Sequence, residues 1–414
     1  MKKKRILMIL NYFYPDVAST GQLMTELCEE LQDDFDITVI AGFPNYTGNI
    51  PQQYNGKRIV KEKYKDIDIL RVRVPEFDKT NKSSRIKYIL AYFFNSILAI
   101  MKSGKQDIVY SISQPPILGG ILGVIGKASK RAKLIYNIQD FNPEQIEAVG
   151  YSKNKFIIEA ARSLDKFSCR LSNKVLVVGR DMQKTLKNRF NDKNVPDSMV
   201  INNWTNEKSI YPLEKDHPRV QEFMKKYNLQ DKFVFMYSGN IGLYYDLENI
   251  IKVIGQFKDN KDVVFAFVGE GAVKQQLVDY SNDNKVRNIR FIPYQDKEDL
   301  IYSLNAADAH IVTNAKGIKG VSVPSKVYGV MATGKSIWAV LEEESEARTL
   351  IEECGCGVTC APEEYDEMKK MIDKLISLDK DELKAMGMRG RKHIEQGYTK
   401  EASTNKYKEL LKSI

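Results

Sequence analysis

The residues best suited to chemistry lie in the segment Gly317–Lys335, which reads GIKGVSVPSKVYGVMATGK. A glycine-containing loop leads to Pro324, and proline suits the first position of a helix because it has no N–H to leave unpaired. Ser325 and Lys326 follow in the predicted first turn, where the partial positive charge of a helix start disfavours lysine. A bound anion would compensate both charges, and free amides at a helix start bind phosphate. The alternative is a solvated lysine at an ordinary junction between loop and helix.

Two further loops of the second half contain glycine directly after an apolar run. SGNIGLYYD contains Gly239 and Asn240, and VGEGAV places Glu270 at the end of the next run. Glycine lets the backbone approach a ligand closely, and a carboxylate at Glu270 could hold ribose or sugar hydroxyls. Each loop alone is equally consistent with an ordinary solvated turn. Their repetition beside the lysine segment predicts one lip of a nucleotide site.

The first half carries candidate residues after two of its apolar runs. Gly21 lies at a predicted helix start, where it offers free amides to an anion or belongs to an ordinary N-cap. Asp140 and Glu144 follow another run in the segment QDFNPEQIEAVG. Acidic residues there could bind acceptor hydroxyls or act as general base. The alternative is helix capping by Asn142 and Pro143, with Glu144 complementing the dipole; function is favoured for Asp140, and both interpretations stand for Glu144.

The elements that must position these residues alternate between apolar runs and segments of helical periodicity. Near-continuous apolar strands separated by helices predict an α/β protein with parallel sheets covered on both faces. In the first half these runs lie at 6–10, 37–41, 69–74, 108–111, 134–138 and 175–178. In the second half they lie at 233–237, 263–268, 289–292, 309–312 and 337–340.

A chain of 414 residues exceeds what one core usually supports, so two doubly wound domains are expected. We predict a first domain over 1–203, a second over 204–392, and a final segment 393–414 whose helix packs back on the first domain. Segment 202–218 is polar and contains two prolines, as a connector does. Because such domains bind ligands at the carboxyl ends of their strands, the predicted site lies in the cleft between them.

Composition limits the class of protein and of partner. A hydrophobic content of 43% and a charged content of 28% are typical of a folded globular protein. The net charge of +9 favours anionic partners such as nucleotides, diphosphates or phospholipid surfaces. Five cysteines without a secretory signal indicate a reducing cytoplasm. The three histidines are scattered, which argues against a histidine triad, and no metal site is expected.

The segment 88–101 is apolar and aromatic, with basic residues before and after it. An apolar body with basic flanks is typical of a helix that lies in a membrane interface. The alternative is a buried crossover helix. We favour partial membrane contact because aromatic residues gather at Tyr88, Tyr92, Phe93 and Phe94. The glycine run at 120–126 lacks the spacing of a dinucleotide fingerprint, and we expect it inside an apolar helix.

In their order and spacing, these motifs resemble those of the GT-B-fold retaining glycosyltransferases of family four. The resemblance runs nearly the whole length, through FYPDVASTGQ, DFNPEQIEAVG, SGNIG, FVGEG, AADAHIV and VPSKVYGVMATGK. Within the family, the chain looks most similar to bacterial enzymes of capsule and O-antigen assembly, especially N-acetyl-L-fucosamine or fucosyl transferases.

The resemblance implies transfer of a sugar from a UDP-sugar, with a GDP-sugar as the other donor, to a polyprenyl-diphosphate-linked saccharide. It implies two Rossmann-like domains, no metal or other cofactor, no nucleic acid, and a place at the inner face of the bacterial cell membrane. Carried over by position, the residues at the diphosphate would be Gly21, Gly239, Asn240, Ser325 and Lys326. Glu270 and Tyr294 would lie near the nucleoside or sugar, and Asp140 near the place of a family histidine.

The chain also departs from the family pattern. Two glutamates spaced eight positions apart are replaced by Val321 and Gly329. The phosphate charge then rests on Lys326, with Lys316, Lys319 or Arg180 as further candidates. The sugar and the base stay open, and a divergent enzyme is compatible with the sequence. The alternatives are a non-hydrolysing 2-epimerase, which the scarcity of histidine argues against, and a catalytically silent nucleotide-sugar-binding regulator.

Overall fold

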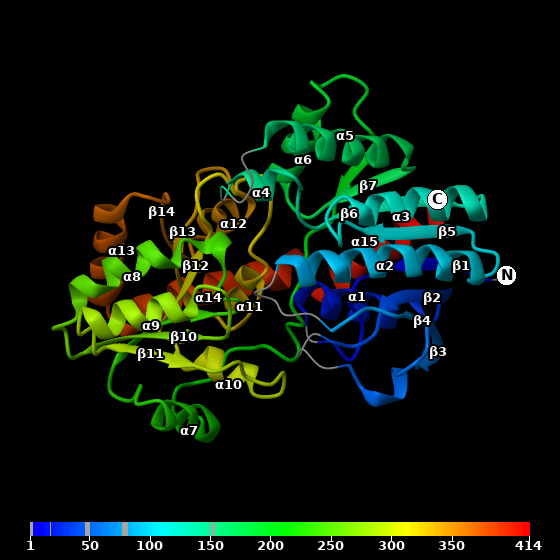
Figure 1. Cartoon of the computed structure of the whole chain (residues 1–414). Helices are drawn as coiled ribbons and strands as arrows, with labels where there is room; N and C mark the ends of the chain where they lie inside the picture. Colours follow the sequence, from blue (N-terminus) through cyan, green and yellow to red (C-terminus); the bar gives the residue numbers. More distant parts are fainter. Residues whose placement is uncertain (1–2, 17, 46–49, 77–81, 149, 151–153) are drawn as a thin grey trace. The chain divides into compact units, whose positions relative to one another are not determined.

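The computed structural model describes residues 3–16, 18–45, 50–76, 82–148, 150 and 154–414. The chain forms two compact units (Figure 1). The first consists of the residues up to Asn202 together with Thr404–Ile414, and the second of Asn203–Ser403. The residues from Thr404 onward are therefore part of the first unit.

The first unit contains an eight-stranded sheet in the order β3-β4-β2-β1-β5-β6-β7-β8. All neighbours are parallel except β3 and β4, which are antiparallel. The strands are β1 Lys4–Ile9, β2 Phe35–Gly42, β3 Ile59–Tyr64, β4 Ile67–Val72, β5 Ile108–Ile112, β6 Lys133–Ile138, β7 Lys174–Val177 and β8 Ser198–Val200. All six predicted strands are confirmed. Two further strands were not predicted, namely β3, a half-exposed edge strand, and the very short β8.

Helices cover this sheet because its central strands are buried along their length. They are α1 Ser19–Leu31, α2 Lys82–Lys102, α3 Leu118–Lys130, α4 Glu144–Ala148, α5 Lys155–Leu171 and α6 Arg180–Arg189. α3 packs on β5 and β6 and lies between α2 and α5, so these three helices form one layer (Figure 1).

Close packing of α3 explains its glycines, which lie inside an apolar helix as predicted. A Cβ atom at Gly119 would lie 2.0 Å from the carbonyl oxygen of Ile112, and one at Gly123 would lie 2.3 Å from Ser111 Oγ. No side chain fits at such distances. The glycine run therefore sets the distance between helix and sheet.

The C-terminal helix α15, Lys400–Ser413, contributes to the core of the first unit. Tyr407 is buried, and its hydroxyl accepts a hydrogen bond from Asn137 Nδ2 at 2.9 Å. Lys408 and Lys412 lie 2.7 and 2.5 Å from the carboxylate of Asp34. These two lysines lower the pKa of Asp34 to about 2.

The second unit contains a six-stranded sheet in the order β11-β10-β9-β12-β13-β14, parallel throughout. The strands are β9 Phe233–Ser238, β10 Val263–Val268, β11 Ile289–Ile292, β12 Ala309–Thr313, β13 Ser336–Val340 and β14 Gly357–Cys360. Five were predicted; β14 was missed because its residues alternate between buried and half-buried. Cys360 lies in β14 and Cys356 directly before it, both buried and with free thiols.

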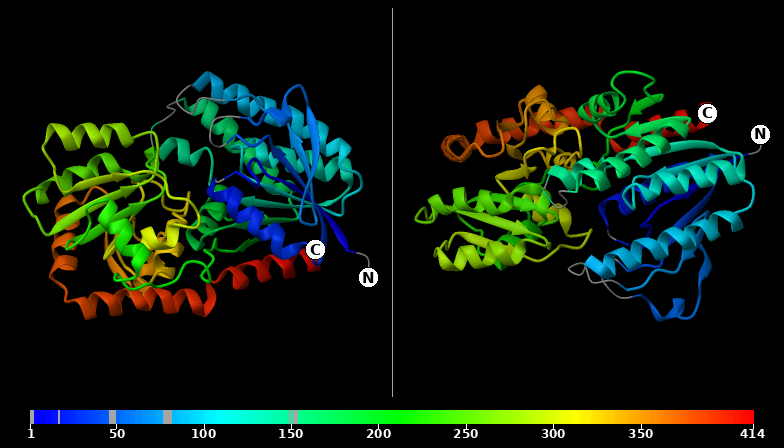
Figure 2. Two further views of the ribbon diagram at one scale, coloured as in Figure 1. Left: turned by 90° about the horizontal axis from the view of Figure 1, so that it is seen from below. Right: turned by 45° about the horizontal axis from the view of Figure 1, so that its top comes forward.

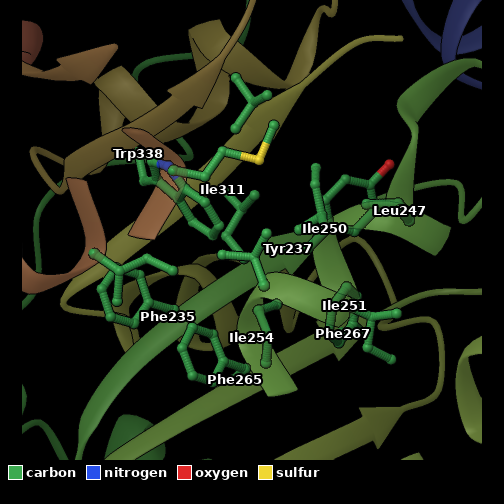
Figure 3. Close-up of a cluster of buried hydrophobic side chains, with 14 of the residues drawn as sticks. Phe235, Tyr237, Leu247, Ile250, Ile251, Ile254, Phe265, Phe267, Ile311 and Trp338 are labelled. Carbon is green, nitrogen blue, oxygen red and sulfur yellow. The ribbon is translucent and has the colours of Figure 1, made fainter. Parts of the chain in front are cut away.

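The helices of the second unit enclose a core rich in aromatic side chains (Figure 3). They are α7 Pro218–Lys226, α8 Leu247–Ile254, α9 Lys274–Asp283, α10 Leu300–Asn305, α11 Lys326–Ala332, α12 Glu346–Cys354, α13 Tyr365–Ser377 and α14 Lys380–Gly397. Phe235 stacks on Phe265 and meets the edge of Trp338. Strand β9 lies near the centre of this sheet, so the loop that follows it is held by well-packed neighbours.

Two of the aromatic residues in helix α2 are buried, which removes part of the support for membrane contact of this segment. Tyr88 and Tyr92, two of the aromatic residues on which that argument relied, are 3% and 0% exposed. They pack in the core of the first unit, as the alternative of a crossover helix requires. Phe94, in contrast, is 59% exposed. Among the residues that the structure describes, none of the helices combines the length and the hydropathy that crossing a bilayer requires.

The glycine contacts of α3 lead to a stability prediction. Gly123→Ala should lower the free energy of unfolding by about 1–3 kcal/mol, because its methyl group would overlap Ser111 and Leu134. The control is Gly397→Ala at the end of α14, where an added Cβ meets nothing within 4 Å. That variant should be unchanged or slightly stabilised. Thermal unfolding followed by circular dichroism measures both, and equal losses would contradict the packing argument.

Candidate functional site

Two glycine loops interlock at the carboxyl ends of β9 and β10. The amide of Gly239 donates to the carbonyl of Val268 at 2.9 Å, and the amide of Ile241 donates to the carbonyl of Glu270 at 2.9 Å. Gly239 has a φ of +140°. A Cβ atom at Gly271 would lie 2.1 Å from the carbonyl oxygen of Ile241. The backbone thus comes to the surface without side chains, as binding of a ligand through the backbone requires.

Lys326 is brought directly to these loops. Its Nζ lies 3.7 Å from the ring centroid of Tyr237 and 4.1 Å from that of Tyr245. The position of a Cβ on Gly239 would be 3.8 Å from the same Nζ. Of the predicted site residues, Lys326, Gly239 and Asn240 therefore form one group. The contacts of the two tyrosines with Lys326 were not predicted. Tyr237 lies in a strand and Tyr245 in the loop after it, and the sequence does not show that their rings face the lysine.

The ammonium group of Lys326 is buried and has no hydrogen-bond partner among the residues that the structure describes. Burial lowers the pKa of Lys326 well below its ordinary value. The faces of the two tyrosine rings offset part of the cost of burying the charge, by about 0.5–2 kcal/mol for such contacts. They supply no hydrogen-bond acceptor. An anion that reached Nζ would supply both the acceptor and the opposite charge.

The helix that carries Lys326 starts later than predicted. α11 begins at Lys326 rather than at Pro324, and Pro324 and Ser325 form the turn before it. The carbonyl of Pro324 accepts from the amide of Val327 at 3.0 Å. Ser325 has helical dihedral angles and its side chain caps nothing. The feature that stands out here is thus the lysine side chain, because the short helix α11 does not begin with the predicted proline turn.

The other predicted residues of this unit lie along the same edge of the sheet. Asn240 is exposed beside Gly242, and its carbonyl accepts from the hydroxyl of Tyr237 at 2.6 Å. The carboxylate of Glu270 is 63% exposed and pairs with Lys274 at 2.6 Å. Tyr294, after the edge strand β11, is 55% exposed. Because β11, β10 and β9 are neighbours, these residues follow one another along one edge.

The other lysines considered for the phosphate are bound to acidic residues. Lys319 lies 3.1 Å from Glu344, and Lys316 lies 2.5 Å from Glu363. Glu342 is the second residue after β13. Its carboxylate accepts hydrogen bonds from the backbone amides of Gly317 and Lys319 at 2.9 Å each. Glu342 holds the loop before Lys326 in place. This role of Glu342 was not predicted, although an acidic residue soon after a buried strand could have indicated it.

In the first unit, Gly21 and Asp140 lie on loops or helix starts after strands, as predicted. Gly21 is buried in the first turn of α1, and a Cβ there would lie 3.0 Å from that of Tyr12. Asp140 follows β6 and is half-buried. Its amide donates to Ser113 Oγ at 3.3 Å, and its carboxylate accepts from Gln145 Nε2 at 3.3 Å. Asp140 thus stays a candidate to bind an acceptor hydroxyl.

Glu144 is held by arginines. It starts α4, as the capping interpretation has it, and accepts from Arg189 Nε at 2.8 Å and from Arg162 Nε at 3.2 Å. Burial alone would raise the pKa of Glu144, but Arg189 outweighs it and the pKa is lowered. Arg189 also pairs with the buried Asp165 and covers the ring of Phe141. A carboxylate so paired is a poor proton acceptor, and this geometry favours a structural role for Glu144.

The second unit is similar to a known family of enzymes. Residues 219–393, most of the second unit, match the family described as "Glycosyl transferases group 1". The chain is 27% identical over 420 residues to the probable glycosyltransferase WbjE of Pseudomonas aeruginosa, covering 99% of this chain and 98% of WbjE. It is 25% identical to the putative colanic acid biosynthesis glycosyl transferase WcaI of Escherichia coli K12, covering 90% of this chain and 91% of WcaI.

Solved structures agree on the architecture. Sucrose-phosphate synthase from Thermosynechococcus elongatus superimposes with a TM-score of 0.79 at 14% identity, covering 99% of both chains. Anabaena HepE in complex with UDP and glucose superimposes with a TM-score of 0.69 at 14% identity, again covering 99% of both chains. The chain has the GT-B fold. The predicted fold of two Rossmann-like, doubly wound domains with parallel sheets is therefore confirmed, and the second GT-B domain carries the lysine site.

The arginine network of the first GT-B domain leads to a second prediction. Arg189→Met leaves the buried carboxylates of Asp165 and Glu144 without their main partner, which should cost about 3–5 kcal/mol of unfolding free energy. Arg5→Met is the control, because Arg5 pairs with Asp107 near the surface, where solvent screens an ion pair and its loss should change stability far less. Urea unfolding measures both. Equal losses of unfolding free energy in the two variants would show that the buried network contributes no more to stability than a surface ion pair.

Proposed function

We propose that this chain is a retaining glycosyltransferase. It transfers a sugar, N-acetyl-L-fucosamine or a related hexosamine, from a UDP-sugar to a lipid-linked saccharide in capsule or other surface polysaccharide biosynthesis. The match to the group 1 glycosyl transferases and the names of both relatives support the class of reaction. The UDP complex of HepE, a protein of the same fold, supports UDP as the leaving nucleotide.

The observation that carries the proposal is the buried Nζ of Lys326 beside Gly239, which has no hydrogen-bond partner in the part of the chain that the structure describes. Cleavage of the bond between sugar and phosphate leaves negative charge on the departing diphosphate. A preorganised ammonium group and backbone amides stabilise that charge in a site with little water, without any metal. Attack from the same face as the leaving group retains the anomeric configuration, and a donor phosphate oxygen takes the acceptor proton.

The remaining roles follow from position. Glu270 and Tyr294, both exposed along the same edge of the sheet, would contact the nucleoside or the sugar. Asp140 in the first domain would bind an acceptor hydroxyl. A lipid-linked acceptor places the reaction at a membrane surface, for which we propose the inner face of the bacterial cell membrane. The basic net charge of +9 suits both an anionic donor and an anionic lipid.

Removing the ammonium group tests the site. Lys326→Met should abolish the thermal shift that UDP produces in the wild-type protein, because the diphosphate loses its cation. Without nucleotide, the same variant should be more stable at neutral pH by about 1 kcal/mol or more, because the wild-type protein must bury a lysine whose pKa is lowered on folding although it is charged in the unfolded chain. This gain should vanish above the ordinary lysine pKa of ~10.4, where the unfolded chain is also neutral. Unchanged UDP binding would refute the site.

Proton uptake provides a second test. Because the pKa of Lys326 is lowered and a bound diphosphate would raise it again, binding of UDP at about pH 8.5 should take up protons. Affinity should accordingly fall as the pH rises through this range. Calorimetry in two buffers of different ionisation enthalpy measures the uptake. Lys326→Arg, which stays charged, should bind without uptake; equal uptake in both proteins would contradict the assignment.

The reaction itself is tested by incubating the protein with UDP- and GDP-sugars and a lipid-linked acceptor. The expected result is release of UDP together with a longer saccharide that keeps the anomeric configuration. Release of a free sugar without acceptor would instead identify the epimerase, and UDP binding without any turnover would identify the silent regulator. Lys384→Met is a suitable control, because it removes a lysine of the same domain that is 59% exposed in its pair with Glu214 and leaves Lys326 in place.

A further inference from the structure

Helix α5 of the first domain presents its apolar face to solvent. Phe156, Ile157, Leu164, Phe167 and Leu171 are 85%, 60%, 49%, 49% and 38% exposed. Their spacing places them on one side of the helix, as successive turns of 3.6 residues require. A surface helix normally turns such a stripe towards the core. Here the stripe points outward and extends along the whole helix.

The opposite face of α5 explains why the helix cannot roll over. Its buried residues include Asp165, Ser168 and Cys169. The carboxylate of Asp165 accepts from the hydroxyl of Tyr136 at 2.7 Å and pairs with the buried Arg189. Turning the apolar stripe inward would expose this bonded network and bring five large side chains into a filled core. The orientation is therefore fixed by buried polar bonds.

Helix α2 carries a second outward stripe in the same layer. Ile86, Leu90, Phe94 and Met101 are 57%, 45%, 59% and 56% exposed. α3 lies between α2 and α5, and the three helices run side by side (Figure 1, Figure 2). The outward residues of α3 are apolar as well: Ile121 and Val124 are half-buried and Ala128 is exposed. We call the outward side of α2, α3 and α5 the docking layer.

The charged residues on the three helices of the docking layer are mostly positive. α2 and α3 contain no aspartate or glutamate. α5 contains two, and both are bonded to arginine: Asp165 to Arg189 and Glu159 to Arg162. The basic residues with described side chains on the three helices are Arg85, Lys87, Lys102, Lys127, Lys130, Lys155, Arg162, Lys166 and Arg170.

Basic groups also gather where the helices end. Lys130 donates to the carbonyl of Met101 at 3.2 Å, and Lys127 donates to that of Leu171 at 2.6 Å. The C-terminal ends of all three helices therefore lie together, with lysines at the end of each apolar stripe. Long basic side chains beside exposed Phe, Leu and Ile are the composition of a surface that enters the headgroup region of an anionic membrane.

We infer that the docking layer binds an anionic lipid surface, with the stripes of α2 and α5 buried among the headgroups and the basic residues on lipid phosphates. The positive charge selects this occupant over a second copy of the chain, whose own docking layer would bring like charges together. The inference names the membrane partner of the proposed transferase and in that sense rests on the proposed function. Its physical basis is independent of the lysine site.

The experiment is co-sedimentation of the full chain with vesicles of phosphatidylcholine alone or with about a third of phosphatidylglycerol, without donor or acceptor. The wild-type protein should bind the anionic vesicles at least tenfold more tightly. The double variant Phe156→Asp and Phe167→Asp should lose at least tenfold in affinity for them. Lys87→Gln with Lys102→Gln should weaken binding to anionic vesicles and reduce its dependence on salt.

The matched control is Tyr211→Asp with Tyr365→Asp, two exposed aromatic residues of the second domain, 43% and 39% exposed. This variant should bind vesicles like the wild type, and unfolding temperatures verify that each variant folds. Equal losses in control and test variants would overturn the proposal. So would a stable dimer without vesicles that dissociates on Phe156→Asp, because that would assign the layer to a second copy.

The two proposals fail separately. Vesicle binding through the docking layer without UDP binding would leave this inference standing and remove the proposed reaction. UDP binding that Lys326→Met abolishes, without any vesicle binding, would leave the donor site standing and remove the docking layer.

Discussion

The most unusual feature of the second domain is the buried ammonium group of Lys326. Lys326 ends between the faces of Tyr237 and Tyr245, with its Nζ buried and without a hydrogen-bond partner among the residues described by the structure. Burying a cation in this way costs free energy unless an opposite charge arrives. The rings reduce the cost without removing it. An anion that reached this ammonium group would supply the missing charge and hydrogen-bond acceptor.

The surrounding structure keeps this group in place. The loops after β9 and β10 are joined by backbone hydrogen bonds, and Glu342 binds the amides of Gly317 and Lys319 in the loop before the lysine. Glycines at 239, 269 and 271 let these loops come so close together that any Cβ would collide at two of the three positions, 269 and 271. The site is thus made of backbone and one lysine, mounted on a parallel sheet whose centre is filled by aromatic side chains (Figure 3).

The first domain uses its charged residues differently. Its buried ion pairs join α4, α5 and α6, and Glu144 is one member of them rather than a free base. The same bonds hold α5 with its apolar face outward. Asp140, by contrast, keeps a half-buried position at the end of β6. Glu144, which is paired with arginines, and Asp140, whose carboxylate accepts a hydrogen bond from Gln145, thus lie only four positions apart in the chain.

Much of the fold was predictable because its central strands are continuous apolar runs between helical segments, a pattern that permits little besides a covered parallel sheet. The strands that were missed, β3, β8 and β14, lie towards the edges, where side chains alternate or the strand is very short. The glycine loops and Lys326 were also predictable, since glycine after a buried strand indicates a close approach of the backbone. The sequence by itself therefore determined which segments are buried and where the chain turns.

The tertiary structure decided the rest, because side chains distant in the chain meet only after folding. The partners of Glu144 at Arg162 and Arg189, the bonds of Lys316 and Lys319 with acidic residues, and the two tyrosines at Lys326 all depend on how helices and loops pack. The outward face of α5 is the clearest case. Its helical pattern by itself predicts an apolar stripe turned inward, and the buried bond between Asp165 and Arg189 turns it outward, because a paired charge cannot leave its partner at low cost.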